Sequence, residues 1–299
     1  MIVGALDIGS NSIHLLIAEF VDGQIRPIQR YKEKVMLGAG FDEDQNLTYA
    51  SMDPGLNTLY KFIQHVNFYN VEKLYCVATN TLRLANNRQK FIQKAEQILM
   101  HPIHVISGNT EARMIWRGVI AERGNDQTGL VIDIGGGSTE FARASELNND
   151  PKTWSLQMGC VSYLEQFFTD HKINDHNIQS ALAAAEECLA TFVKELLPVP
   201  DAQAIGTAGT IESISVFCRE IFPEDNGLIK FSQLAPLLDA LKQHGSIEAL
   251  PYDSLDDSRK QILPAGLCIC CVIMEQLNIA TIEYAESELC EGVLVEHLL

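Results

Sequence analysis

The stretch that decides the fold is Asp7-Ile8-Gly9-Ser10-Asn11-Ser12, which returns as Asp133-Ile134-Gly135-Gly136-Gly137-Ser138. Asp, Ile, the first Gly and the closing Ser keep the same register at an offset of 126 residues. Each copy follows a short apolar run, residues 2–6 and 130–132, and precedes a second one. We interpret the two copies as an internal repeat of one unit, a strand, a Gly-rich turn and a second strand.

Between and after the two copies, strand-like runs alternate with segments of helical spacing. Apolar residues at 56, 59, 60, 63 and 66 predict a helix over residues 53–69, and residues 73–78 are strand-like. Residues 79–86 are interpreted as a polar turn that carries Arg83, and residues 174–197 as one long helix. This alternation predicts an α/β fold. The repeat predicts two similar domains with a cleft between them.

Composition limits the classes of function. The chain has 299 residues, 46% of them hydrophobic, and a formal net charge of -17, so we expect no nucleic-acid and no membrane partner. An anionic substrate has to be bound by a few placed cations and backbone amides. The eight cysteines show no zinc-ligand spacing, and Cys268, Cys270 and Cys271 are predicted to be buried free thiols. The start of the chain lacks a basic secretory signal, and we expect a cytoplasmic protein.

The two Gly-rich turns have the chemistry of phosphate cradles. Glycine lets a backbone approach a phosphate closely, and successive N–H groups in such a turn bind anions. An ordinary hairpin turn explains either loop alone, but matched copies favour the phosphate interpretation. The loop before residue 211 looks like a helix N-terminus of the kind that binds phosphate, an interpretation that many α/β loops would also fit. The predicted phosphate-binding residues are Gly9, Ser10, Asn11, Ser12, Gly135, Gly136, Gly137, Ser138, Thr139, Gly209 and Thr210.

Charged residues near these loops suggest the rest of a phosphate site. Asp7, Asp133 and Glu140 are candidate ligands of Mg²⁺, which binds through one or two carboxylates, waters and substrate phosphates. Turn capping is the alternative for the two aspartates. Glu111 is a candidate base for an attacking water, or merely a favourable acid in a first helical turn. Arg83 is a candidate phosphate contact, or a surface arginine.

Together these segments resemble a known family, the exopolyphosphatase / guanosine pentaphosphate phosphohydrolase (Ppx/GppA) family. The resemblance covers nearly the whole chain. Beyond the two hairpins it is carried by Ala-Thr-Asn-Thr-Leu-Arg (78–83), Ile-Ser-Gly-Asn-Thr-Glu-Ala-Arg (106–113), Met-Gly-Cys-Val-Ser (158–162) and Gly-Thr-Ala-Gly-Thr (206–210).

The resemblance implies two actin-like, ribonuclease H-like domains of the actin, sugar kinase and heat-shock ATPase superfamily. Residues 1–123 would form the first, with a C-terminal helix at 291–299 packing back on it, and residues 124–290 the second. It implies Glu111 as the catalytic base, Asp133 as a metal ligand and Arg83 as a substrate contact. It also implies a homodimer.

The chain departs from the family pattern in three ways. Many relatives have a second Glu where this chain has Thr110. Near the C-terminus relatives commonly carry Gly-x-Leu-Arg-Glu-Gly, where this chain reads Ser-Glu-Leu-Cys-Glu-Gly with Glu288 and Cys290. Long relatives add C-terminal helical domains, which makes high processivity on long polyphosphate less expected here.

The sequence therefore predicts an enzyme that removes the terminal phosphate of inorganic polyphosphate or guanosine pentaphosphate. The predicted reaction is attack by a water that Glu111 activates, assisted by Mg²⁺ as the cofactor. Two alternatives stay open: an ATP-dependent small-molecule kinase of the same superfamily, and a non-catalytic sensor of the alarmone or of polyphosphate.

Overall fold

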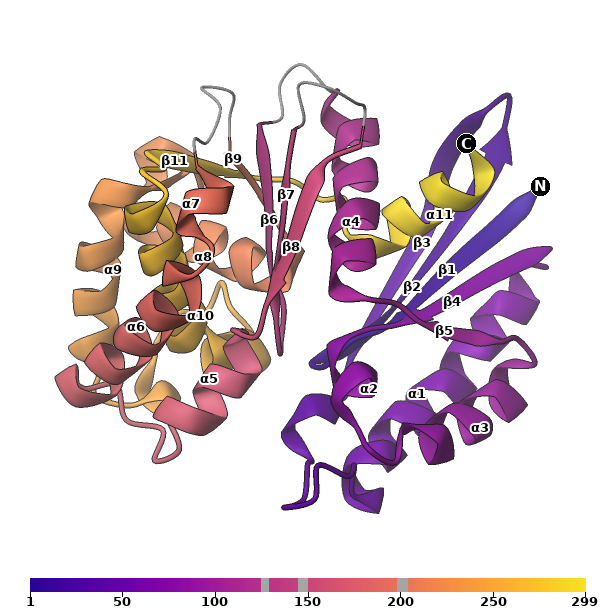
Figure 1. Ribbon diagram of the computed structural model, residues 1–299, viewed down its shortest axis with the longest axis horizontal. Helices are drawn as coiled ribbons and strands as arrows, with labels where there is room; N and C mark the ends of the chain where they lie inside the picture. The colour runs from indigo at the N-terminus through magenta and orange to yellow at the C-terminus, as the bar shows by residue number, and fades with distance from the viewer. Residues whose placement is uncertain (125–128, 145–149, 198–203) are drawn as a thin grey trace. The chain divides into compact units, whose positions relative to one another are not determined.

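The computed structural model describes residues 1–124, 129–144, 150–197 and 204–299 (Figure 1). Their contacts divide the chain into two compact units. Unit 1 is Met1–Ala121 with Ser287–Leu299, and unit 2 is Glu122–Glu286. Among the helices in these ranges, none has the length and apolar character needed to cross a membrane.

Unit 1 is built on a five-stranded sheet in the order β3-β2-β1-β4-β5. The β1–β2 and β2–β3 pairs are antiparallel, and the β1–β4 and β4–β5 pairs are parallel. β1 is buried along most of its length because it lies at the centre of the sheet. The strands are β1 (Ile2–Ile8), β2 (Ser12–Val21), β3 (Gln24–Lys34), β4 (Lys73–Ala78) and β5 (Ile103–Val105).

Helices pack on both faces of this sheet. Helices α1 and α3 pack on each other and cover one face, while α11 packs on β1 and β2 from the other face (Figure 1). Apolar side chains of α1 and α3 recur at helical spacing and complete a core with the inner face of the strands. The helices are α1 (Tyr49–Phe68), α2 (Asn80–Leu84), α3 (Arg88–Leu99), α4 (Gly108–Arg123) and α11 (Leu289–Leu298).

Helix α11 is held on unit 1 by a contact between two glycines. A Cβ on Gly292 would lie 1.8 Å from the carbonyl oxygen of Met114, and a Cβ on Gly118 would lie 2.9 Å from the Gly292 nitrogen. Only glycine lets α4 and α11 approach so closely. Arg113 and Arg117 both pair with Glu296 and fasten the other end of α11.

Unit 2 is built on a six-stranded sheet in the order β10-β11-β9-β6-β7-β8. The β6–β7 and β7–β8 pairs are antiparallel, and the β6–β9 and β9–β11 pairs are parallel. The strands are β6 (Leu130–Ile134), β7 (Thr139–Arg143), β8 (Lys152–Leu156), β9 (Ala204–Thr207), β10 (Ile229–Lys230) and β11 (Thr281–Tyr284).

The core of unit 2 surrounds helix α10, which packs against α5, α6, α8 and α9. Every residue from 262 to 274 of α10 is buried, as expected for a helix that is apolar on all sides. The helices are α5 (Cys160–Phe167), α6 (Asp175–Ala190), α7 (Val193–Leu196), α8 (Ala208–Ile221), α9 (Phe231–Lys242) and α10 (Asp257–Gln276).

The two sheets repeat one topology. When β1, β2, β3, β4 and β5 are replaced by β6, β7, β8, β9 and β11, the strand order and every pairing direction are the same. Among the strands of the described residues, unit 2 adds β10, which lies at its outer edge beside β11. The predicted α/β fold and the predicted repeat are confirmed.

Local expectations were wrong at several points. The segment with Arg83 is a short helix, α2, whose Asn80, Thr81 and Leu82 are buried, and five residues are too few to show a helical period. The helix expected over residues 174–197 is broken into α6 and α7 by a turn in which the Phe192 N–H donates to Leu189. Strands β8 and β10 were not predicted.

The cysteines of both units are free thiols, and all but Cys188 are buried. The prediction for Cys268, Cys270 and Cys271 on α10 is therefore confirmed. Burial raises the pKa of the Cys271 thiol to about 12.

Candidate phosphate and metal site

The two Gly-rich turns are closed by the same backbone hydrogen bond. The Gly9 N–H donates to the Ser12 carbonyl at 3.1 Å, and the Gly135 N–H donates to the Ser138 carbonyl at 2.9 Å. Each turn directly follows the aspartate near the end of the central strand, Asp7 in β1 and Asp133 in β6. The repeat read in the sequence is therefore a repeat of one hydrogen-bonded hairpin.

In each unit, the segment after the third strand binds the carbonyl groups of the hairpin. In unit 1 the N–H groups of Val35 and Met36 donate to the Asn11 carbonyl, both at 2.9 Å. In unit 2 the donor is at the N-terminus of α5, where the Cys160 N–H donates to the Gly135 carbonyl at 2.9 Å. A Cβ on Gly159 would lie 2.4 Å from the Gly136 carbonyl oxygen, so the approach of α5 requires glycine.

Two carboxylates face the same point beside the hairpin of unit 2. Asp133 Oδ1 lies 3.9 Å and Glu140 Oε2 lies 4.0 Å from the place where a Cβ on Gly135 would stand. Asp133 and Glu140 are buried and are opposed across the β6–β7 pair. The Ser138 carbonyl oxygen lies 3.0 Å from the same point, so glycine at 135 avoids crowding at a place that three oxygen atoms surround.

Hydroxyl groups orient Glu140. Its Oε1 atom accepts hydrogen bonds from Ser138 Oγ at 2.8 Å and from Ser155 Oγ at 2.6 Å. Ser155 stands opposite Glu140 on β8. Because both hydroxyls bind Oε1, the Oε2 atom is the one turned toward Gly135 and Asp133.

This donor set fits a hard divalent cation. Carboxylate oxygens are the protein ligands that Mg²⁺ prefers, and Mg²⁺ usually takes only one or two of them and completes its shell with water and phosphate. Within residues 1–124, 129–144, 150–197 and 204–299, His, Cys, Asp and Glu side chains form no group of three or more placed to hold a metal. A cation held by Asp133 and Glu140 would therefore depend on other ligands, such as substrate oxygens.

In unit 1, Arg83 and Glu111 form an ion pair. Arg83 Nη1 donates to Glu111 Oε2 at 2.5 Å and to the Ile106 carbonyl at 3.2 Å. Glu111 is in the first turn of α4 and is 8% exposed. Burial raises the pKa of Glu111, and the Arg83 guanidinium opposes that rise. A buried carboxylate with a raised pKa has the character of a general base.

Asp7 is the unit 1 counterpart of Asp133. Burial, followed by the charges of Glu111 and Glu288, raises the pKa of Asp7 well above its usual value. Its Oδ1 atom is buried and, among the described residues, has no hydrogen-bond partner; the same is true of Asn11 Oδ1 and Asn80 Oδ1. Asp7 belongs to unit 1, whereas Asp133 and Glu140 belong to unit 2.

Several predicted phosphate-binding side chains make contacts within their own unit. Ser10 Oγ accepts a hydrogen bond from Thr81 Oγ1 at 2.8 Å. Thr139 Oγ1 donates to the Met158 carbonyl at 2.6 Å. Thr210 is buried, with its methyl group against Gly266 of α10. The side chains of Thr139 and Thr210 are therefore occupied by contacts that stabilise the fold. At these two positions the backbone is the group that remains available to a ligand.

The third loop carries an unusual backbone conformation. Ala208 has a φ of 63°, in the left-handed region that non-glycine residues rarely adopt. The Gly209 carbonyl accepts hydrogen bonds from Ser213 Oγ at 2.7 Å and from Arg259. Arg259 also pairs with Glu212, so this cation already has an anionic partner on α8.

Sequence reasoning missed His14 and Lys32 beside the unit 1 hairpin, and it noted Glu288 only as a departure from the family pattern, with no partner. His14 Nδ1 lies 2.6 Å from Glu288 Oε2, and Lys32 Nζ lies 3.4 Å from Glu288 Oε1. A signal was present, because the offset of 126 residues that aligns the hairpins also aligns His14 with Glu140. The contact with Glu288 comes from the far end of the chain and has no sequence signal of that kind.

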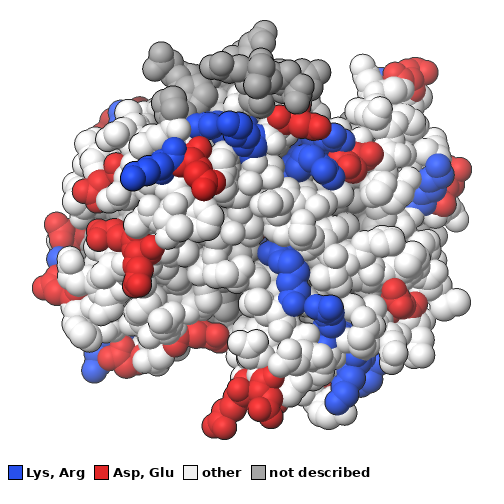
Figure 2. Space-filling view, in the orientation of Figure 1, with Lys and Arg blue, Asp and Glu red and all other residues white. Residues whose placement is uncertain are grey.

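The net negative charge is not gathered into one region of the visible surface. On the face shown in Figure 2, Asp and Glu side chains form several separate groups with Lys and Arg among them. Local basic positions therefore exist on an acidic chain, as an anionic substrate requires.

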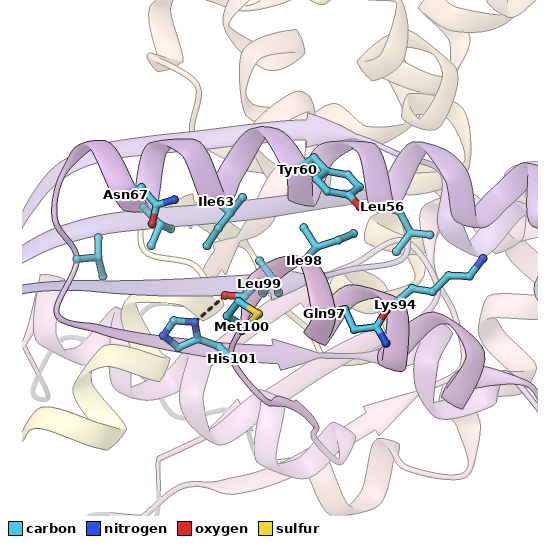
Figure 3. A pocket seen from close by; sticks show the side chains of 12 residues that line it. Leu56, Tyr60, Ile63, Asn67, Lys94, Gln97, Ile98, Leu99, Met100 and His101 are labelled. Atoms are coloured by element: carbon cyan, nitrogen blue, oxygen red, sulfur yellow. Dashed lines mark hydrogen bonds between the residues drawn. The ribbon is translucent and has the colours of Figure 1, made fainter.

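A cavity of about 540 Å³ lies between α1 and α3 in unit 1. Figure 3 shows Leu56, Tyr60 and Ile63 of α1 on one side and Ile98 on the other. Lys94 lies at its edge, where the ammonium group is 5.2 Å from the Tyr49 ring centre. This lining is mainly apolar and does not suit a chain of charged phosphates.

The repeated sheets and hairpins define the class of fold, two units of the actin-like α/β fold. A solved exopolyphosphatase from Cytophaga hutchinsonii superposes with a TM-score of 0.89, at 23% identity, covering 100% of this chain and 98% of that one. An Aquifex aeolicus Ppx/GppA protein superposes with a TM-score of 0.80, at 24% identity, covering 100% and 97%. The predicted fold class is confirmed.

The chain belongs to the Ppx/GppA phosphatase family, whose family model matches residues 16–299. A guanosine-5'-triphosphate,3'-diphosphate pyrophosphatase from Aliivibrio fischeri (strain MJ11) is 35% identical over 289 residues. That match covers 97% of this chain and 58% of the relative, so the chain spans little more than half the length of the curated relatives it matches.

Proposed function

We propose that this protein is a phosphohydrolase that removes the terminal phosphate of inorganic polyphosphate or of guanosine pentaphosphate. The observation that carries the proposal is the Arg83–Glu111 pair, a buried carboxylate with a raised pKa held 2.5 Å from a guanidinium. A base for water and a cation for phosphate oxygens thus occur together in unit 1.

In this proposal the hairpins bind the phosphate chain. Backbone N–H groups of Ser10, Asn11, Gly136 and Gly137 are the proposed donors to phosphate oxygens, because a turn of successive N–H groups favours anions. Arg83 contacts an equatorial oxygen of the terminal phosphate and stabilises the charge that develops there. In this proposal, when substrate binds, N–H groups of the Arg83 guanidinium leave Glu111 and donate to the phosphate instead.

Glu111 then acts on water. The water oxygen forms a bond to the terminal phosphorus, and the bond from that phosphorus to the bridging oxygen breaks. Glu111 accepts one proton from the water, and the shortened phosphate chain leaves with the bridging oxygen. The reaction depends mainly on positioning and electrostatics, as phosphoryl transfer generally does.

Asp133 and Glu140 of unit 2 would hold the divalent cation, which we propose to be Mg²⁺. When bound, such a cation supplies charge neutralisation on the phosphate oxygens. Ser138 and Ser155 keep Glu140 in the orientation that this role needs.

The names of the relatives support both substrates. One relative is named a guanosine-5'-triphosphate,3'-diphosphate pyrophosphatase and one solved structure an exopolyphosphatase. The family resemblance also supports the proposal that the protein is a cytoplasmic homodimer. Sedimentation equilibrium of the purified chain tests whether it forms a dimer.

Phosphate release from short polyphosphate, long polyphosphate and guanosine pentaphosphate, each with Mg²⁺, tests the proposal. Glu111→Gln should lower the rate on the preferred substrate by about 100- to 10,000-fold, the usual contribution of a general base. Glu122→Gln makes the same change at the far end of α4 and serves as the control. A Glu111→Gln protein with the parental rate would contradict the assignment. Release of phosphate without an acceptor separates this function from a kinase.

A further inference from the structure

Ser12, His14 and Glu288 form a hydrogen-bonded chain beside the hairpin of unit 1. Ser12 Oγ lies 3.0 Å from His14 Nε2, and His14 Nδ1 lies 2.6 Å from Glu288 Oε2. A hydroxyl, an imidazole and a carboxylate in this order resemble the arrangement by which a carboxylate orients a histidine toward a serine. Ser12 itself belongs to the predicted phosphate loop.

The carboxylate in this chain is ionised. Burial alone would raise the pKa of Glu288, but the charges of His14 and Lys32 hold it well below its usual range. An ionised carboxylate accepts hydrogen bonds and cannot donate them, so His14 Nδ1 must carry a proton. Glu288 therefore fixes both the ring orientation of His14 and the nitrogen, Nε2, that faces Ser12.

Glu288 is itself held firmly in place. It is the N-cap of α11, where its N–H donates to Glu291 Oε2 at 3.0 Å. The close approach of Gly292 to Met114 fixes the helix behind it. A rigid support of this kind is what a positioning residue needs.

The unit 2 hairpin has a different chemistry at the matching positions. Ser138 contacts Glu140 as Ser12 contacts His14, and Ser155 stands opposite Glu140 as Lys32 stands opposite His14. In unit 2 the Ser138 hydroxyl thus hydrogen-bonds to the Glu140 carboxylate. In unit 1 the Ser12 hydroxyl hydrogen-bonds to the His14 imidazole.

We propose that His14 and Glu288 are positioning residues that act through Ser12 and hold its hydroxyl in place for a substrate phosphate. The inference rests on the proposed function, since it takes Ser12 to contact phosphate. The charged or titratable groups around His14 include Asp7 opposite it on β1, Lys32 opposite it on β3, and Glu288 and Cys290 on α11, where the Cys290 thiol contacts the His14 carbonyl.

A double-mutant cycle on phosphate binding tests this inference. Calorimetry measures the Kd of tripolyphosphate for the parent, Ser12→Ala, His14→Phe and the double variant, with thermal melting to verify folding. Loss of one hydrogen bond to a charged group should weaken binding about 10-fold in each single variant. If His14 acts only through Ser12, the double variant should be no weaker than Ser12→Ala.

Two further variants separate positioning from a structural role. Glu288→Gln should weaken binding severalfold, and His14→Gln, which keeps a nitrogen near the Nε2 position, should recover part of the loss. Glu296→Gln removes another ion pair of α11 and should leave binding unchanged. Additive losses in the cycle, or equal losses in Glu288→Gln and Glu296→Gln, would overturn the inference. Should His14→Phe not fold, His14→Gln takes its place in the cycle.

The same samples separate this inference from the proposed function. Phosphate release by the parent protein decides whether it is a hydrolase. Coupling between Ser12 and His14 in tripolyphosphate binding decides the positioning role, and it is measured without turnover. Either result can fail while the other holds.

Discussion

The hairpins of the two units share a backbone and differ in the side chains that surround it. Each turn closes with the same hydrogen bond, and each follows an aspartate of a central strand. Two residues after the closing serine, however, unit 1 has His14 and unit 2 has Glu140. Unit 2 thereby gains a second carboxylate beside Asp133, whereas unit 1 gains an imidazole whose partner comes from α11.

Under the proposed function, this difference assigns the cation to the hairpin of unit 2 and a side-chain contact with phosphate to the hairpin of unit 1. A pair of carboxylates suits a cation, and a hydroxyl held by an imidazole suits a phosphate oxygen. Arg83 and Glu111, the proposed phosphate contact and the proposed base, also lie in unit 1.

Among the variants that compare the two units, the largest effect is expected from removing Asp133, the unit 2 carboxylate that the family resemblance marks. Asp133→Asn should lower the rate of phosphate release about 1,000-fold, because the charge stabilisation of a bound cation is worth several kcal/mol. Activity should recover in part at high Mg²⁺. A rate near that of the parent at low Mg²⁺ would remove Asp133 from the metal site.

A smaller effect, with a pH signature, is expected from Arg83. Burial raises the pKa of Glu111 and Arg83 opposes that rise. A base must be ionised, so kcat/KM should fall as the pH drops through the raised pKa. Arg83→Gln removes the opposing charge, which moves this acid limb to higher pH and lowers kcat/KM about 100-fold.

The measurement is the profile of kcat/KM against pH for the parent, Arg83→Gln and the exposed control Lys90→Gln. An acid limb that stays in place, or moves to lower pH, would show that Glu111 does not act as the base.

The next prediction concerns stability, because α11 packs on β1 and β2, the two strands that the unit 1 hairpin joins. Gly292→Val places a side chain where a Cβ meets Met114 at 1.8 Å. Overpacking of this kind should lower the free energy of unfolding by about 1–3 kcal/mol. Urea unfolding measures it, with Gly245→Val as a comparison at a glycine that has no atom near its Cβ position. Gly245 has a positive φ, so its loss reports backbone strain rather than crowding.

The smallest effect is expected from the hydroxyl that orients Glu140. Ser155→Ala should raise the Mg²⁺ concentration needed for half activity about 10-fold, as loss of an outer contact to a metal ligand generally does. The matched change in unit 1, Lys32→Gln, should leave that concentration unchanged. Equal shifts in both variants would erase the distinction between the two hairpins.

Much of the fold was predictable because it depends on a repeated local pattern. The Asp-Ile-Gly turns with their flanking apolar runs identify β1, β2, β6 and β7, and hence the two sheets. Strand β8 was missed although the repeat required it, because Lys152–Leu156 is short and only half apolar. Helix α2 was taken for a turn because its buried side chains include Asn80 and Thr81.

The site was predictable only in part, for a similar reason. Glu111 and Arg83 lie in narrow motifs, and the structure brings them into contact within unit 1. The pairing of Glu288 with His14 joins residues from opposite ends of the chain. This contact forms because α11 packs on β1. No local pattern in the sequence around His14 or Glu288 predicts their pairing.

The difference between the two hairpins is tested most directly by one comparison, a Mg²⁺ titration of phosphate release for Glu140→Gln and Ser12→Ala. We predict that Glu140→Gln raises the Mg²⁺ requirement and that Ser12→Ala raises the KM for substrate while leaving the Mg²⁺ requirement as in the parent. If both variants shift the Mg²⁺ requirement alike, or only Ser12→Ala shifts it, the assignment of the cation to unit 2 and of the side-chain contact with phosphate to unit 1 is contradicted.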